Sequence, residues 1–143
     1  MELEAAVREM ADREAIRDLA CRYAHCVWQK DAVGATELFT EDGVMDTGDR
    51  PPLEGREIML ESYRQMLEES ELRPFVHNHV IELAGDRAAG TCYLDLHAVI
   101  DGKPMTGLGH YEDQYARVEG QWKFRSRKLN MCQLTEAPAA VTS

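Results

Sequence analysis

Two histidines separated by one residue are the first candidates for chemistry. His77 and His79 flank Asn78 within an otherwise apolar run. Side chains two residues apart on a strand point to the same face, so both rings are expected on the face that carries Ile81 and Leu83. Histidine titrates near neutral pH and can carry protons. The pair predicts either a proton carrier or a structural histidine held by hydrogen bonds.

A tyrosine and an aspartate offer further groups for proton transfer. Tyr23 lies on the apolar stripe of a helical segment, so its hydroxyl needs an interior partner, although the ring can also serve the core alone. Asp113 is flanked by Tyr111 and Tyr115, and all three side chains share one face of a strand. On the inner face the pKa of Asp113 would be raised, and on the outer face it would be an ordinary surface acid.

Arg127 lies where the alternation of apolar residues changes phase. Phe124 belongs to one face and Leu129 to the other, which predicts a β-bulge near Ser126. A bulge would let Arg127 reach the mouth of a pocket, whereas a solvated surface charge is the simpler interpretation.

The sequence predicts chemistry without metal or cofactor. A metal at His77 and His79 would need a third ligand such as His97, His110 or a carboxylate, and no spacing supports a specific set. There is also no Gly-rich phosphate loop and no motif for a Ser or Cys nucleophile.

Hydrophobic spacing predicts that helices occupy the N-terminal half. Ile16, Leu19, Tyr23 and Val27 recur at steps of three and four residues and form one apolar stripe. The expected elements are a helix over 4–29, a short helix capped by Asp31 that holds Leu38 and Phe39, a strand over 44–47, a loop over 48–52, and a helix over 55–69.

The second half changes to a period of two, which is typical of strands. Strands are expected over 75–83, 88–100, 105–118 and 121–134, separated by turn sequences such as Asp101-Gly102. Helices followed by a meander indicate an α+β fold, in which the curved, mostly antiparallel sheet and three helices on its concave face enclose a cone-shaped pocket. The strand over 88–100 would turn Leu94 and Leu96 inward.

Composition limits the partners. The formal net charge of −10 argues against nucleic acid and anionic membranes, and no apolar stretch is long enough to cross a bilayer. With no secretory signal, a cytoplasmic protein is expected. We expect one domain over 1–135 and a disordered tail over 136–143. The outer face of the strand over 88–100, with Tyr93, Asp95, His97 and Val99, predicts a homodimer.

Several motifs together resemble one superfamily. The opening residues 15–24 and 38–43, and the later residues 109–117 and 120–124, resemble SnoaL-like proteins of the nuclear-transport-factor-2-like superfamily. This superfamily includes scytalone dehydratase, bile-acid dehydratase, hexachlorocyclohexane dehydrochlorinase and ketosteroid isomerase. The resemblance implies a cone-shaped α+β barrel with an inner pocket.

The resemblance also implies site residues. Tyr23 and His77 fall on catalytic positions of family members, Arg127 on an active-site arginine, Tyr111 on a pocket aromatic, and Asp113 near a hydrogen-bond-donating aspartate. This chain departs from the pattern at three positions. Trp28 and Leu96 stand where relatives carry aspartates, and Thr47 stands where the isomerase has its general base.

The leading hypothesis is a cofactor-free lyase or isomerase that acts on a small, largely apolar cyclic or polyketide- or steroid-like molecule. His77 would remove a proton, and Tyr23, helped by Asp113 or Arg127, would stabilise the oxyanion or protonate the leaving group. The expected substrate-binding residues are Trp28, Met45, Thr47, Met66, Leu94, Leu96 and Tyr111. The alternatives are a non-catalytic module that binds an apolar ligand and an assembly subunit resembling a dioxygenase β chain.

Overall fold

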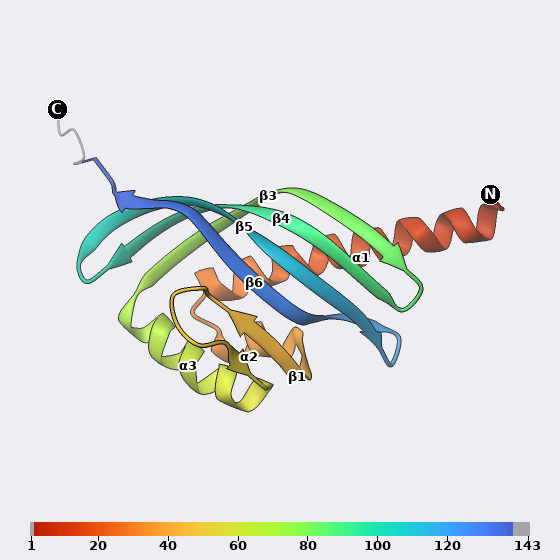
Figure 1. The fold of residues 1–143 in the computed structure, drawn as a ribbon, viewed down its shortest axis with the longest axis horizontal. Helices are drawn as coiled ribbons and strands as arrows, with labels where there is room; N and C mark the ends of the chain where they lie inside the picture. Colours follow the sequence, from red (N-terminus) through yellow and green to blue (C-terminus); the bar gives the residue numbers. More distant parts are fainter. Residues whose placement is uncertain (1, 139–143) are drawn as a thin grey trace.

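A computed structural model describes residues 2–138 and shows three helices beneath a curved sheet (Figure 1). The chain turns from helical to extended structure after residue 70, as the change of hydrophobic period predicts. The elements are α1 (Leu3–Trp28), α2 (Ala32–Glu37), β1 (Phe39–Asp46), β2 (Leu53–Glu54), α3 (Arg56–Glu69), β3 (Glu71–Ala84), β4 (Arg87–Ile100), β5 (Lys103–Val118) and β6 (Gln121–Glu136).

The sheet has six strands in the order β2-β1-β6-β5-β4-β3. All neighbouring strands are antiparallel except β1 and β6, which run parallel. The predicted α+β fold is confirmed, but the sheet is open and does not close into a barrel. Within residues 2–138 the two-residue β2 pairs only with β1, and no strand of this part joins the edge at β2 to the edge at β3. Instead, α1 packs across the concave side against β3 and β6.

The apolar stripe of α1 is buried as predicted. Ile16, Leu19, Tyr23 and Val27 are each at most 4% exposed. The short helix α2 begins at its predicted cap, because the Asp31 carboxylate accepts a hydrogen bond from the Gly34 amide at 2.9 Å. This capping satisfies a helix-terminal N–H and fixes the sharp turn between α1 and α2.

The segment after α2 differs from the prediction. Leu38 follows the helix, and Phe39 begins β1, where it pairs with Phe124 of β6 and is fully buried. The pairing shifts register between Phe39 and Val44, and Gly43 fits there because a Cβ would lie 2.9 Å from the Phe39 Cβ. Parallel pairing with a strand 85 residues away decides this structure, and local periodicity cannot show it.

Strand β4 has the predicted faces. In β4 Cys92 and Leu94 are buried, whereas Tyr93 and His97 on the other face are exposed. The bulge near Ser126 is confirmed, because Gln114 pairs with Ser126 while the next residue of β5, Tyr115, pairs with Phe124. This shift moves alternate residues after Ser126, namely Arg127, Leu129 and Met131, to the concave face.

The C-terminal boundary lies later than expected. Glu136 belongs to β6, and the Ala137 amide donates to the Pro104 carbonyl at 2.8 Å. Residues 139–143 of the predicted tail lie outside the described residues. Among residues 2–138, no helix combines the length and apolar character needed to span a membrane.

Candidate functional site

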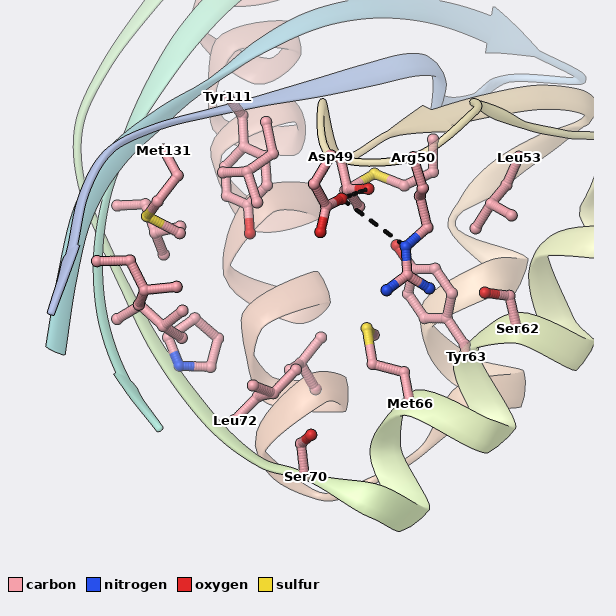
Figure 2. A pocket seen from close by; sticks show the side chains of 18 of the residues that line it. Asp49, Arg50, Leu53, Ser62, Tyr63, Met66, Ser70, Leu72, Tyr111 and Met131 are labelled. Carbon is pink, nitrogen blue, oxygen red and sulfur yellow. Dashed lines mark hydrogen bonds and ion pairs between the residues drawn. The ribbon is translucent and has the colours of Figure 1, made fainter. Parts of the chain in front are cut away.

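An apolar cavity of about 480 Å³ lies between the concave face of the sheet, α1, α3 and the loop from β1 to β2 (Figure 2). This volume is in the range of small-molecule sites. The lining residues are Tyr23, Val27, Met45, Thr47, Asp49, Arg50, Leu53, Ser62, Tyr63, Met66, Ser70, Leu72, Pro74, Leu94, Leu96, Ile100, Tyr111, Leu129, Met131 and Leu134.

A pair of tyrosine hydroxyls is the main polar feature of this lining. Tyr23 of α1 and Tyr63 of α3 are 4% and 2% exposed, and their hydroxyl oxygens lie 2.5 Å apart. One hydroxyl donates to the other, so the proton of the accepting hydroxyl remains free to donate to a third group. The ring of Tyr111, from β5, meets the Tyr23 ring edge to face at 6.0 Å.

Burial sets the protonation of the hydroxyl pair. It raises the pKa of both Tyr23 and Tyr63, so both are neutral at physiological pH. Either hydroxyl can be the donor in the hydrogen bond between them, so either can present its proton to a ligand.

The loop between β1 and β2 brings a carboxylate to the cavity. Among the described lining residues, Asp49 is the one acidic side chain. Its Oδ1 accepts a hydrogen bond from the Thr47 hydroxyl at 2.6 Å and lies 3.7 Å from the Arg50 Nε. Figure 2 shows the Asp49 and Arg50 side chains directed toward the cavity. The site thus combines hydroxyl donors with a carboxylate acceptor.

A second polar group lies on the same concave face but outside the cavity lining. We call His79, Asp113, Tyr115 and Arg127 the charged cluster. Arg127 donates from Nε and Nη2 to the two carboxylate oxygens of Asp113 at 2.8 and 3.1 Å, and both side chains are fully buried. The Tyr115 hydroxyl donates to Asp113 Oδ2 at 2.8 Å and lies 2.7 Å from His79 Nε2. Because the hydroxyl proton goes to Asp113, His79 donates from Nε2.

The structure therefore decides where the side chains of Asp113 and Arg127 point. Asp113 faces inward with Tyr111 and Tyr115, but it is ion-paired with Arg127 instead of lying alone in an apolar setting. The prediction that Arg127 reaches the mouth of the pocket is wrong. Its guanidinium carbon lies 3.6 Å from the Tyr111 ring centroid and 4.6 Å from that of Tyr23, so the arginine packs behind the tyrosines.

The prediction that His77 shares a pocket with Tyr23 is wrong. His77 is exposed and is not part of the cavity lining. Val76 pairs with Leu94 and His79 with Cys92, so two residues of β3 oppose one of β4 in a β-bulge. The bulge reverses the side-chain phase, and of the two histidines only His79 shares the inner face with Ile81.

Trp28 also lies outside the cavity, contrary to the prediction. It is 38% exposed, donates from its indole N–H to the Pro74 carbonyl at 2.7 Å, and meets the Phe75 ring at 5.4 Å. It closes the end of α1 against β3 and does not line the cavity. The other predicted wall residues do line it, and their substrate-binding role remains a prediction: Met45, Thr47, Met66, Leu94, Leu96 and Tyr111.

Two polar parts of the site were not predicted from the sequence. Tyr63 lies on the apolar side of α3, the same kind of signal that singles out Tyr23, so a search for inward tyrosines could have found it. Asp49 and Arg50 lie in a loop without periodicity, where no local pattern indicates direction. Within residues 2–138, no three His, Cys, Asp or Glu side chains gather as a metal site would require.

Comparisons with known proteins agree with this architecture. Residues 8–128 match the family model described as a SnoaL-like domain. A hexachlorocyclohexane dehydrochlorinase of type 2 is 18% identical with a TM-score of 0.88, covering 96% of this chain and 97% of its own. A provisionally assigned scytalone dehydratase from Novosphingobium aromaticivorans is 18% identical with a TM-score of 0.83, covering 92% and 91%.

A third structure has higher sequence identity. A provisionally assigned aromatic ring hydroxylase from Novosphingobium aromaticivorans is 27% identical with a TM-score of 0.83, covering 90% of this chain and 94% of its own. No curated protein sequence matches the chain. Because the family model spans most of its length, the chain belongs to the SnoaL-like family.

Proposed function

We propose that this protein is a cofactor-free acid–base enzyme of the lyase or isomerase class. Its substrate is a small, largely apolar molecule that carries a carbonyl or hydroxyl group. The observation that carries this proposal is the buried Tyr23–Tyr63 hydroxyl pair in the lining of an apolar cavity. Hydrogen-bond donors held in a dry site stabilise developing negative charge without reorganisation, which is a large source of catalysis.

The two tyrosines have different roles in this proposal. Tyr63 donates to the substrate oxygen, and Tyr23 donates to Tyr63 as negative charge develops there. The Arg127 cation behind the Tyr23 ring favours such charge, because it lowers the pKa of Tyr23 against the effect of burial. Dehydration by β-elimination is the leading reaction, in which Tyr63 protonates the departing hydroxyl or holds the enolate oxygen.

Asp49 takes the place of His77 as the proposed base. The exposed His77 cannot reach a ligand in the cavity, whereas Asp49 lines it. Asp49 would remove the proton next to the carbonyl carbon while Tyr63 holds the oxygen. The family supports such chemistry, since the structural relatives named above include a dehydrochlorinase and a provisionally assigned dehydratase.

The ionisation of a bound phenol tests the hydroxyl pair without knowledge of the substrate. We expect para-nitrophenol to bind in the cavity and to ionise at a lower pH than in water, because the tyrosines stabilise its oxyanion. In Tyr63→Phe the bound phenol should ionise at a higher pH than in water, as burial alone dictates. Absorbance of the phenolate measures both. Tyr93→Phe, which removes an exposed hydroxyl of β4, is the matched control.

Turnover is tested with a β-hydroxy phenyl ketone, whose dehydration produces an ultraviolet-absorbing enone. Tyr63→Phe should lower kcat by about 10²–10³, the usual cost of removing one oxyanion donor. Asp49→Asn should abolish turnover while leaving phenol binding intact. A protein that shifts phenol ionisation but turns over no ketone or related substrate would support the alternative of a ligand-binding module.

We also propose that the chain forms a homodimer through the outer face of the sheet. Phe75, Tyr93 and Leu108 are 48%, 44% and 54% exposed, and Asp95 pairs with both Phe75 and Leu108, so these side chains share one patch. Burial of this patch would remove apolar surface from water. Sedimentation should give a dimer at micromolar concentration, and Tyr93→Glu should shift it to monomer.

A further inference from the structure

Arg50 is the one cationic side chain among the described residues that line the cavity. It lies in the loop between β1 and β2, and Figure 2 shows its guanidinium directed toward the cavity. The remaining lining is largely apolar apart from Asp49 and the hydroxyl groups, so Arg50 is the one positive charge that a ligand meets there. A guanidinium in that position favours a ligand with a negatively charged group near Arg50.

Arg50 makes an ion pair but no hydrogen bond within residues 2–138. Its Nε lies 3.7 Å from Asp49 Oδ1, beyond hydrogen-bond distance, and its side chain is 60% exposed, so its donors are open to a ligand that enters the cavity. Asp49 Oδ1 is already occupied by the Thr47 hydroxyl at 2.6 Å. A guanidinium has five N–H donors in a planar fork, which fits the two oxygens of a carboxylate.

The loop restricts the backbone on both sides of Arg50. The Asp46 carboxylate accepts a hydrogen bond from the Gly48 amide at 2.9 Å, and Gly48 has a positive φ of 83°. Pro51 and Pro52 then restrict the chain directly after Arg50. These features limit where the arginine backbone can lie, while its side chain remains free to adjust to a ligand.

We propose that Arg50 binds an anionic group of the ligand and that the cavity takes an amphiphilic acid. The apolar ring or chain of this acid lies against Leu94, Leu96 and Met131, and its carboxylate reaches Arg50. This proposal rests on the proposed function in that both use the same cavity, but it does not depend on the proposed reaction. Since the formal net charge of the chain is −10, the overall field repels anions, and a preference for acids must come from a local contact.

The test compares three ligands of the same size: phenylbutyrate, phenylbutyramide and phenylbutylamine. Calorimetry on the full chain should show phenylbutyrate binding about tenfold more tightly than the amide, which corresponds to one charge-assisted contact. Arg50→Gln should remove this preference and leave the affinity for the amide unchanged. Arg50→Lys should retain part of it, because lysine supplies charge without the fork.

A matched control separates contact from general charge. Arg64→Gln removes an exposed arginine of α3 that does not line the cavity, and it should leave the preference for the acid intact. Equal affinity for acid and amide, tighter binding of the amine, or equal losses in Arg50→Gln and Arg64→Gln would each overturn the proposal. These ligands are inert, so the result is independent of the nitrophenol and turnover experiments on Tyr63.

Discussion

The charged cluster and the Tyr23–Tyr63 pair lie on the same concave face, yet their polar groups have different uses. In the charged cluster, Asp113 accepts two hydrogen bonds from Arg127 and one from Tyr115, so its capacity is met within the protein. In the tyrosine pair, one hydroxyl proton remains free at the cavity. Arg127 Nη1 is also buried without a hydrogen-bond partner among the described residues, but Arg127 does not line the cavity. The contrast teaches that an unpaired buried polar atom marks a ligand site only when it faces a cavity.

The two regions still interact through Arg127. Burial alone would lower the Arg127 pKa, but the charge of Asp113 raises it above the ordinary arginine value, so the guanidinium stays charged. This cation packs on the rings of Tyr111 and Tyr23, and it counteracts the rise in the pKa of both that burial causes. The charged cluster therefore supports the tyrosine pair without contacting the ligand.

The largest expected effect comes from removing the anion of the charged cluster. Asp113→Ala leaves Arg127 buried without its counter-ion, and the free energy of unfolding should fall by about 3–5 kcal/mol. Urea denaturation measures this. Asp18→Ala, which breaks the exposed pair with Arg22, is the control and should change little. The double variant Asp113→Leu with Arg127→Met should recover most of the stability, and a failure to recover would argue against unpaired charge as the cause.

An intermediate effect separates the two regions directly. Tyr115→Phe removes one donor to Asp113 and should lower the free energy of unfolding by about 1–3 kcal/mol. It should leave the ionisation of bound para-nitrophenol unchanged, because Tyr115 does not line the cavity. Tyr63→Phe should instead change ligand ionisation strongly, because Tyr63 lines the cavity. If both variants changed the ionisation of the bound phenol equally, the two regions would have to be regarded as one site.

The smallest expected effect is a change in pH dependence at His79. Burial lowers the pKa of His79, and the nearby charge of Asp113 only partly opposes this. Unfolded histidine takes up a proton below about pH 6.5 while folded His79 resists it, so stability falls as pH is lowered through that value.

His79→Gln should reduce this loss of stability. Urea denaturation at a pH above and a pH below the unfolded value measures the difference. The exposed His77→Gln on the same strand is the control and should leave the wild-type pH profile unchanged. If His79→Gln left the pH dependence of stability unchanged, groups other than His79 would be responsible for it.

The sequence by itself determined the features that depend on neighbours along the chain. The three- and four-residue spacing predicted α1, Asp31 predicted the start of α2, and the turn sequences predicted the hairpins of β4 to β6. The common face of Tyr111, Asp113 and Tyr115 follows from the period of a strand, and the phase change around Ser126 revealed the bulge in β6. These signals are local, because backbone geometry fixes where adjacent side chains point.

Only the tertiary structure decided which polar groups meet. The residue pattern around His77 does not reveal the bulge in β3. The bulge depends on how a long curved strand stays in register with β4. The same holds for Phe39, whose strand exists because β6 lies beside it. Whether Arg127 ends at the pocket or at Asp113, and whether Tyr23 meets Tyr63, depends on distances between elements far apart in sequence, where the cost of burying an unpaired polar group selects the arrangement.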